Sequence, residues 1–378
     1  MCSDRPIFRQ RLGLIVNPIA GMGGKVGLKG TDGPAVLAEA RRRGATPLAG
    51  ARARQALAAF ASAGAVPEIV TGPGELGETI ARDLGFRPRV VGQDPKGDAS
   101  DTRAAAEAMA GDVDLILFAG GDGTARDLFD VVGGRVPVLG IPTGVKMHSA
   151  VFATTPENAG AVAASYFADA ARHHSLRDAE IMDLDDAGTG RGQVQAKLYG
   201  YARVPYVRSR VQHAKAGGGT DDEADLDALC RMIAGNLEPG CVHLIGPGTT
   251  TQRILRYAGL EGTLLGVDAV SDGRLIGTDL SEAEILALTE GRPVRLIVGV
   301  IGGQGFLFGR GNQPLSAAVL RRLGRDRITV VSSLSKILSL DEHRLLVDTG
   351  DREMNASLAG FIRVQTAPDH SLLLKVAA

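Results

Sequence analysis

The sequence predicts an α/β protein: a first domain with a mostly parallel, doubly wound sheet, and a second, β-rich domain. Three observations lead to this prediction. The chain has 378 residues, of which 44% are hydrophobic and 22% charged, so it is long enough for two cores. Up to about residue 150, short apolar runs alternate with alanine-rich helical stretches. Beyond that point, strand-like runs follow one another with fewer helices between them.

In the first domain, a strand is expected wherever a short β-branched or apolar run occurs, and a helix wherever an alanine-rich stretch follows it. The expected strands are 12–16, 68–70, 89–91, 115–118 and 136–141. The expected helices are 34–43, 51–63, 75–84, 101–110 and 123–132. This alternation is typical of βα units around a parallel sheet, in which ligands bind beyond the carboxyl ends of the strands.

A helix over 155–171 leads to the second domain. The strands expected there are 197–207, 241–245, 263–270, 274–279 and 294–301, and three more are expected in the tail, at 328–333, 345–350 and 360–364. We therefore expect a nucleotide-phosphate-binding domain over 1–155, a β-rich substrate-binding domain over 172–312 and an α/β segment over 313–378. This last segment either closes the second domain or packs back on the first.

The composition argues against several function classes. A net charge of −1 gives no sign of binding to nucleic acid or to an anionic membrane. Three cysteines, Cys2, Cys230 and Cys241, have no metal-like spacing and form no disulfide framework. The N-terminal segment lacks the apolar region of a signal peptide, and no apolar run reaches the ~18 residues that span a bilayer. We expect a cytoplasmic protein.

The stretch LILFAGGDGTARDLFD, residues 115–130, ends an apolar strand with a glycine-rich turn and begins a helix at once. Gly120, Gly121 and Gly123 allow backbone conformations in which N–H groups converge on an anion. Asp122 lies among them, and Thr124 completes the motif. Because a carboxylate repels a neighbouring phosphate, Asp122 is expected to bind a metal, take a proton or hold the turn.

The loop NPIAGMGGKVGLKGTDG, residues 17–33, follows the first expected strand and carries six glycines with Lys25 and Lys29. Backbone donors and ammonium groups of this kind suit an anion, and the alternative is a surface turn. The loop does not have the glycine spacing of a Walker A motif, and Val26 replaces its hydroxyl residue.

GPGELG, residues 72–77, matches the spacing of a dinucleotide-binding turn, and Asp94 lies 22 residues beyond Gly72. Pro73 stiffens this turn, and one match in a glycine-rich chain is weak. We interpret the stretch as an ordinary βα turn and keep a dinucleotide site as the alternative.

GIPTGVKMHSAVF, residues 140–152, supplies Thr143, Gly144 and Lys146 beyond the strand next to GGDGT. A glycine turn with a hydroxyl and a cation suits phosphoryl transfer, in which the catalyst chiefly orients groups and offsets charge. His148 follows in the same loop; it could touch a phosphate, but a surface or packing role is the favoured interpretation.

Two glycine-rich loops fall in the second domain. IGPGTTTQRI, residues 245–254, again predicts a strand, a glycine turn and a helix. In the alternative interpretation, Thr249 is simply the N-cap of that helix. GGQGFLFGRGNQ, residues 302–313, places Gln304, Arg310 and Asn312 among five glycines. In VDTGD, residues 347–351, Asp348 and Asp351 either bind a metal or form a turn, and the turn is the favoured interpretation.

Together these motifs resemble the ATP-NAD kinase family. The resemblance rests on GGDGT after an apolar strand, VLGIPTG, GPGTTT and a β-rich second domain. The family shares the GGDGT turn with diacylglycerol and sphingosine kinases. VGLKGTDG, GGDGTARD, LLGVDAV, GGQGFLFGRGNQ and VDTGD are most similar to an NAD-kinase-like branch that includes the acetoin catabolism protein X.

The resemblance implies transfer of the terminal phosphoryl group of ATP, or of polyphosphate, to the 2′-hydroxyl of NAD, which gives NADP. It implies Mg2+, dimers or tetramers, and an acceptor held between domains; no metal ligand is assigned within the chain. Asp122 would be the base or the orienting carboxylate for the acceptor hydroxyl. The residues implied to bind nucleotide are Asn17, Gly120, Gly121, Gly123, Thr124, Thr143, Gly144, Lys146, Glu180, Gly246, Gly248, Thr249 and Thr250.

The sequence departs from the family at two acceptor-contacting positions. Pro142 replaces the Asn of the family's GINTG, which removes a side-chain amide and a backbone donor together. Ala179 stands before Glu180 where the family has Asn. Two alternatives to an NAD kinase therefore remain open: a kinase for another hydroxylated metabolite, and a non-catalytic nucleotide sensor on the same scaffold.

Overall fold

The structure is a computed structural model that describes residues 10–28, 34–64, 67–96, 99–144, 147–168, 176–185, 195–205, 220–301, 305–340 and 343–377. The described residues fall into two compact units, which we describe separately. The first unit lies within residues 1–21 and 47–212, and the second within 22–46 and 213–378. The second unit therefore includes a segment near the N-terminus that the sequence places in the first domain.

The first unit is built on a five-stranded parallel sheet in the order β3-β2-β1-β4-β5. Its strands are β1 (Arg11–Val16), β2 (Glu68–Thr71), β3 (Arg89–Val90), β4 (Leu115–Gly120) and β5 (Val138–Pro142). β4 and β5 are buried along their whole length, as continuous apolar runs in a parallel sheet covered on both faces should be. The predicted parallel α/β class is confirmed.

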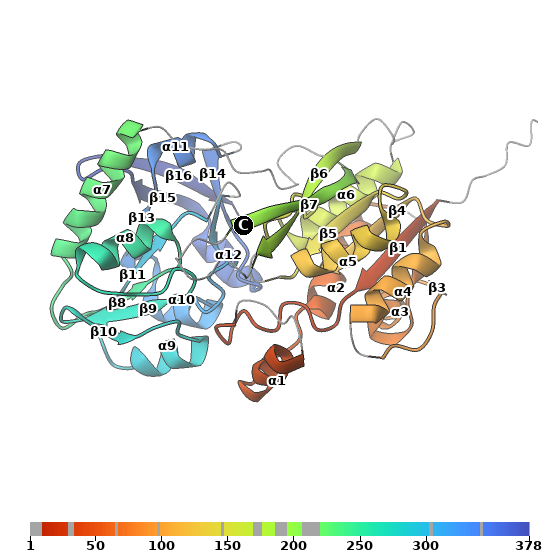
Figure 1. The fold of residues 1–378 in the computed structure, drawn as a ribbon, viewed down its shortest axis with the longest axis horizontal. Coiled ribbons are helices and arrows are strands. Elements are labelled where there is room, and N and C mark those ends of the chain that lie inside the picture. The colour runs from red at the N-terminus through yellow and green to blue at the C-terminus, as the bar shows by residue number, and fades with distance from the viewer. Residues whose placement is uncertain are drawn as a thin grey trace, which may run out of the picture. The chain divides into compact units, whose positions relative to one another are not determined.

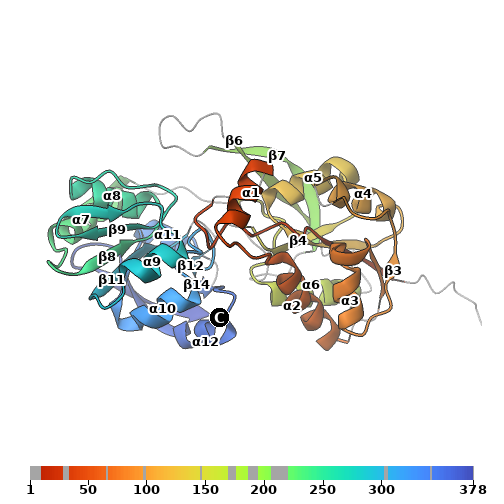
Figure 2. The same ribbon diagram turned by 90° about the horizontal axis from the view of Figure 1, so that it is seen from below.

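Helices cover both faces of this sheet, as Figure 2 shows: α4 and α5 lie on one side, and α2, α3 and α6 on the other. Their bounds are α2 (Ala49–Ser62), α3 (Glu78–Asp83), α4 (Ala99–Met109), α5 (Asp122–Val132) and α6 (Pro156–Ala168). The chain order reverses between β1 and β4, so their carboxyl ends form the topological switch point, where α/β sheets bind ligands.

The helix predicted over 75–84 is interrupted. A short 3₁₀ turn, η1 (Gly74–Leu76), precedes α3, and Gly77 between them has φ +141°. A backbone angle in that range favours glycine and lies outside helical geometry, so the continuous helix cannot form.

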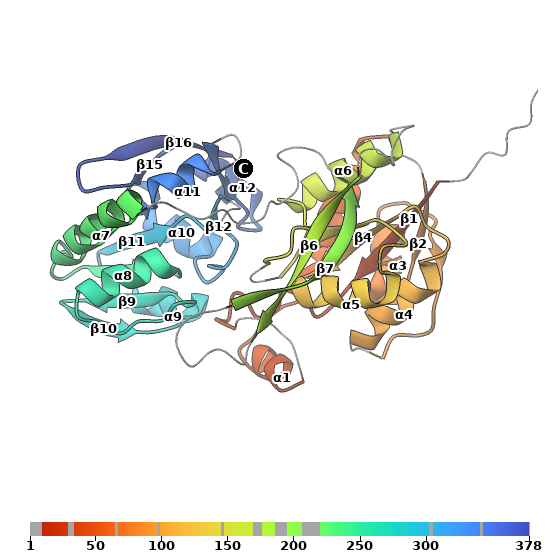
Figure 3. The same cartoon turned by 45° about the horizontal axis from the view of Figure 1, so that its top comes forward.

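An antiparallel hairpin of β6 (Leu176–Asp185) and β7 (Gln195–Pro205) packs on α5 (Figure 3). Tyr199 donates a hydrogen bond to Asp130 Oδ1 over 2.6 Å, and Gly200 lies directly against the Phe129 ring. The hairpin thus belongs to the first unit, which places Glu180 near the switch-point strands.

The second unit is built on a nine-stranded mixed sheet in the order β10-β9-β8-β11-β13-β15-β16-β14-β12. Its strands are β8 (Val242–Ile245), β9 (Asp268–Ser271), β10 (Arg274–Gly277), β11 (Val294–Gly299), β12 (Phe306–Phe308), β13 (Ile328–Val331), β14 (Arg344–Val347), β15 (Gly360–Gln365) and β16 (Ser371–Ala377). β8, β11, β13 and β15 run in one direction, and β12, β14 and β16 run in the opposite one.

Two apolar cores lie on the two faces of this sheet. On β8, Val242 and Leu244 pack into one core and Ile245 into the other, because successive side chains of a strand alternate. Helices α7 and α8 belong to the smaller core, while α9, α10 and α12 belong to the larger one (Figure 1). The helices are α1 (Pro34–Arg42), α7 (Thr220–Gly235), α8 (Thr249–Tyr257), α9 (Glu282–Leu288), α10 (Ala317–Leu323), α11 (Leu334–Leu338) and α12 (Arg352–Leu358).

The C-terminal segment contributes β13 to β16 to this sheet, which is the first of the two alternatives predicted for it. The β-rich second domain is confirmed. No helix within the described ranges combines the length and the hydrophobicity required to cross a bilayer.

Candidate functional site

Asp122 is the first residue of α5, directly beyond the carboxyl end of β4. Its Oδ2 accepts the backbone N–H of His148 over 2.7 Å, and its Oδ1 accepts that of Ser149 over 3.0 Å. The carboxylate is 11% exposed, so it is neither sealed in the core nor free in solvent. A negative charge at this position also interacts favourably with the positive end of the helix dipole.

The loop that binds Asp122 is also attached to the β6–β7 hairpin. Ser149 Oγ accepts the N–H of Met182 over 3.0 Å, and the N–H of Ala150 donates to the carbonyl of Glu180 over 2.7 Å. One short segment thus connects the start of α5 to the middle of β6. The connection brings Glu180 to the site through its backbone.

Asn17 joins the end of β1 to the same helix start. Its Nδ2 donates to Thr124 Oγ1 over 3.0 Å, while its Oδ1 accepts the N–H of Ile19 over 3.2 Å. Its own N–H donates to the carbonyl of Ala119, at the end of β4. Asn17 therefore fixes the loop after β1 against the GGDGT turn.

The GGDGT turn and the turn after β5 are in close backbone contact. A Cβ added to Gly144 would lie 2.9 Å from Gly121 Cα, which is too close for two carbon atoms. The N–H groups of Thr143 and Gly144 both donate to the carbonyl of Gly120, and Thr143 Oγ1 donates to Ile141. These donors hold the turn after β5 against the end of β4.

The structure thus gathers most of the first-unit residues named from the sequence at the switch point: Asn17, Gly120, Gly121, Asp122, Gly123, Thr124, Thr143, Gly144 and Glu180. Lys146 lies outside the described residues. Three turns surround one carboxylate that is held by backbone donors, which is an arrangement suited to orienting a polar ligand at a strand edge.

The four candidate residues of the second unit form a separate strand-turn-helix arrangement. Gly246 follows β8, and Gly248, with φ +134°, is the N-cap of α8. Thr249 and Thr250 are the first residues of that helix, so the interpretation of Thr249 as the N-cap was wrong. The N–H of Gly248 donates to the carbonyl of Leu264, and Thr251 Oγ1 donates to the carbonyl of Gly248.

The glycine-rich loop 17–33 is divided between the two units. Residues 17–21 stay with the switch point, where Gly21, with φ +80°, lies against the carbonyl of Thr143. Residues 22–28 pack in the second unit, where a Cβ on Gly24 would meet Gln313 and Lys25 Nζ lies 4.0 Å from Glu282 Oε2. Lys29 lies outside the described residues.

The GPGELG stretch forms an ordinary βα turn. The N–H of Gly74 donates to Glu78 Oε2 over 3.0 Å, so this backbone donor is bonded within the chain. Asp94 lines a cavity of about 390 Å3 together with Pro73, Leu76 and Val91. That cavity lies at the ends of β2 and β3, away from the switch-point pair β1 and β4.

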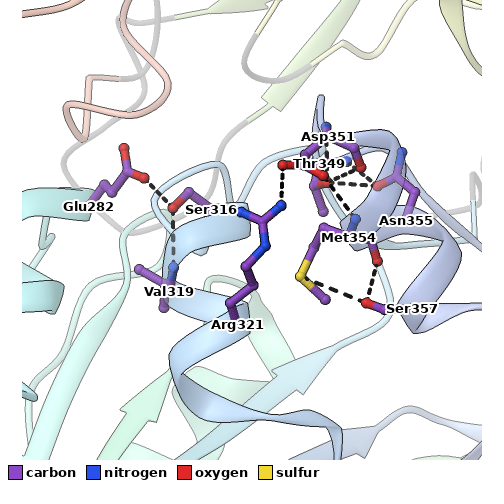
Figure 4. Close-up of polar contacts among 9 residues, drawn as sticks. All are labelled: Glu282, Ser316, Val319, Arg321, Thr349, Asp351, Met354, Asn355 and Ser357. Atoms are coloured by element: carbon purple, nitrogen blue, oxygen red, sulfur yellow. Dashed lines mark hydrogen bonds and ion pairs between the residues drawn. The ribbon is translucent and has the colours of Figure 1, made fainter.

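Figure 4 shows Thr349 and Asp351 of VDTGD at the start of α12 in the second unit. Asp351 caps α12 by accepting the N–H of Met354 over 2.9 Å and pairs with Arg321, while Thr349 Oγ1 donates to Asn355 Oδ1 over 2.7 Å. Asn312 of the GRGNQ segment bonds the carbonyl of Leu307 and the N–H of Gly309. The turn interpretation of Asp351 agrees with these contacts.

His148 and Ser149 are the site residues that the sequence analysis missed. His148 was assigned to a surface or packing role, yet its backbone and ring both lie against Asp122. The signal available was its position in the loop after β5, next to the strand that carries GGDGT. Among the described residues, no group of three or more His, Cys, Asp or Glu side chains could hold a metal ion.

Two family models match the chain. The model described as the ATP-NAD kinase N-terminal domain matches residues 12–171, and the ATP-NAD kinase C-terminal domain matches residues 240–376. The first match includes the complete switch-point cluster apart from Glu180, and the second includes the turn at 246–251. No curated protein and no solved structure matches the chain.

Proposed function

Because the chain belongs to the ATP-NAD kinase family and is thus a kinase in general terms, we propose that it phosphorylates the 2′-hydroxyl of NAD, giving NADP, with ATP or polyphosphate as donor. The observation that carries this proposal is Asp122, which is held at the switch point by the N–H groups of His148 and Ser149. A carboxylate fixed in this way can orient an alcohol or take part in removing its proton.

In this proposal the glycine turns receive the phosphates of the donor. Asn17, Thr124, Thr143 and Gly144 keep the turns in register through the contacts described above, and the missing side chains of Gly120 and Gly121 let Thr124 and Gly144 lie close to the main chain. Gly123 is a further proposed phosphate contact of the same turn. Lys146, Glu180 and the turn of Gly246, Gly248, Thr249 and Thr250 are further proposed nucleotide contacts. Mg2+ would arrive with the donor phosphates, because it binds through one or two carboxylates and otherwise keeps phosphate oxygens and water.

A second candidate is a kinase for another hydroxylated metabolite. Ala179 is 2% exposed in β6, where the family has an NAD-contacting Asn, and Pro142 ends β5 opposite Gly120. Neither side chain can supply the amide that other members use. A non-catalytic nucleotide sensor is the third candidate, and all three share the same switch-point site.

The proposed function is tested with the full chain, labelled ATP or polyphosphate, Mg2+, and a panel of acceptors that includes NAD, NADH and free nucleosides. Label transferred to the 2′-position of NAD supports the NAD kinase, and label on a different acceptor supports the second candidate. Saturable binding of NAD or ATP without any transfer points to the sensor.

The assembly state and the location of the protein are tested separately. Light scattering in the same buffer tests the expected dimer or tetramer, and fractionation of cells tests the expected cytoplasmic location.

A further inference from the structure

The cavity at the carboxyl ends of β2 and β3 lies within the first unit and is separate from the switch point. Its volume of about 390 Å3 is that of a small-ligand pocket. The turn after β2 and the end of β3 line it with Pro73, Leu76 and Val91, and α4 lines it with Ala104 and Ala108. These side chains are all aliphatic. The cavity therefore offers an apolar slot for a flat ring.

Helix α4 leaves this space open because its residues along the cavity are small. Ser100, Ala104 and Ala108 follow one another at intervals of four residues, so they lie on one face of the helix. The loop after β3 is fixed against the start of the same helix, since the N–H of Lys96 donates to Asp101 Oδ1 over 2.8 Å. The hollow is thus held between a helix and a loop that are bonded to each other.

The charged groups of the lining disfavour an anion. Asp94 and Glu107 are exposed, Asp101 is 8% exposed, and Lys96 is the one basic side chain among the lining residues that the structure describes. A phosphate group in the cavity would meet three carboxylates and one ammonium, so it would be repelled. Carboxylates only accept hydrogen bonds, and they therefore favour a ligand that brings donors such as hydroxyl groups.

The GPGELG turn explains which hydroxyl groups fit. In dinucleotide-binding folds, such a turn binds the pyrophosphate, and an acid about 20 residues further on binds the ribose hydroxyls. Here the N–H of Gly74 is bonded to Glu78 within the chain. Asp94, 22 residues beyond Gly72, lines the cavity instead. The acid that would bind a ribose is thus retained, whereas this donor of the turn is already occupied.

We propose that this cavity binds an uncharged nucleoside, as a second ligand site that is independent of the phosphoryl transfer proposed above. The base lies in the slot between the turn residues Pro73 and Leu76 and the alanines of α4. The 2′- and 3′-hydroxyls of the ribose donate hydrogen bonds to the carboxylate of Asp94. Nucleotides are excluded by the acidic lining.

The first test is calorimetry of the full chain with adenosine, AMP and 2′,3′-dideoxyadenosine as probes. Adenosine should bind saturably. AMP should bind at least about fivefold more weakly, because its phosphate meets the carboxylates, and this difference should shrink at about 0.5 M salt. Dideoxyadenosine should bind about tenfold more weakly than adenosine, because it has no ribose hydroxyls to donate to a charged acceptor.

The second test places the binding in the cavity. Asp94→Ala should weaken adenosine about tenfold and leave the affinity for dideoxyadenosine unchanged. Ala108→Leu fills the slot from an exposed position of α4 and should weaken both probes at least about tenfold. Ala61→Leu, at an exposed alanine of α2 on the other face of the sheet, is the matched control and should change both affinities by less than about twofold.

Several results overturn the proposal. One is an AMP affinity equal to that of adenosine, and another is unchanged adenosine binding in Ala108→Leu at an unchanged melting temperature. A third is the absence of saturable binding by adenosine, guanosine and cytidine up to about 5 mM. Adenosine binding that is lost in Asp122→Asn and kept in Ala108→Leu also overturns it, because that binding belongs to the switch point. Failure of the acceptor panel refutes the proposed function alone, since these binding measurements need no turnover.

Discussion

Asn17 Nδ2 donates a hydrogen bond to Thr124 Oγ1 over 3.0 Å, and this bond ties the loop after β1 to the first turn of α5. Thr124 is 4% exposed, so the bond lies largely away from water. It joins the two strands on either side of the topological switch point. A double-mutant cycle can separate the contribution of this bond to the free energy of unfolding from that of the other contacts of the two residues.

We expect Asn17→Ala and Thr124→Val each to lower the free energy of unfolding by about 1–2 kcal/mol, because each leaves a partner unbonded. The double variant should lose less than the sum, with a coupling of about 1 kcal/mol. Denaturant unfolding of the four proteins measures this. A coupling near zero would show that the bond has no energetic role, and the Asn17 bond to Ile19 would then explain a loss in Asn17→Ala.

Gly144→Ala should destabilise the first unit by about 1–3 kcal/mol, since the added Cβ would lie 2.9 Å from Gly121 Cα and 3.1 Å from Met147 Cγ. Gly111→Ala is the matched control, because a Cβ there meets nothing within 4 Å. We expect that control to change stability by less than about 0.5 kcal/mol. Equal melting temperatures for the two variants would contradict the close approach of the two turns.

His243 should make the second unit less stable in mild acid. The side chain is 3% exposed in β8, and its Nε2 accepts the N–H of Glu238 over 3.2 Å. Burial lowers the pKa of His243 below its usual 6.5, against a smaller opposing effect of Glu238. As pH falls through 6.5, the unfolded chain therefore binds a proton before the folded one does, and stability falls.

His243→Gln keeps an acceptor for the Glu238 amide but cannot titrate. The free energy of unfolding of the unchanged protein should drop between about pH 7.5 and pH 5.5, and that drop should be smaller in the variant. Parallel pH profiles for the two proteins would exclude His243 as the source of the acid sensitivity.

Asp222 connects the start of α7 to the short helix α11. Its Oδ1 accepts the N–H of Leu334 over 2.7 Å, its Oδ2 accepts that of Ser335 over 3.1 Å, and the Ser335 hydroxyl also donates to it. Burial raises the pKa of Asp222, but these hydrogen bonds outweigh burial and lower it overall below 3.8. The charged form therefore stabilises the fold above that pH, and this stabilisation is lost as pH falls below 3.8.

Asp222→Ala should cost about 2 kcal/mol at neutral pH, the usual range for hydrogen bonds to a charged group. Asp225→Ala, an exposed acid on the same helix, is the control and should be nearly neutral. Guanidinium unfolding monitored by circular dichroism makes the comparison. Similar losses in both variants would mean that helix charge, and not the contact with α11, determines the result.

Much of the first unit could be predicted because its determinants are local. Buried parallel strands read as unbroken apolar runs, so the strand predicted at 115–118 corresponds to β4, and the glycine turn after it marks the switch point. The helix predicted over 75–84 was wrong because the break depends on the positive φ of a single residue, Gly77, in a stretch where other residues favour a helix.

What the sequence did not reveal depends on contacts between distant segments. The sequence predicts the loop 17–33 as one unit. In the structure, however, Gly24 packs against Gln313 and Lys25 against Glu282, and each partner lies more than 250 positions further along the chain. The role of His148 depends on the fold of the loop after β5, which brings its ring to Asp122. No pattern of spacing encodes either contact.

The mixed direction of the second sheet has a practical consequence for engineering. The turn after β8 opens at one edge, and the turns after β12 and β14 open at the opposite edge, because these strands run in opposite directions. A four-residue strand separates such edges by roughly 13 Å. Over that distance substitutions usually act additively. The two sets of turns can therefore be diversified in separate libraries and the best variants recombined.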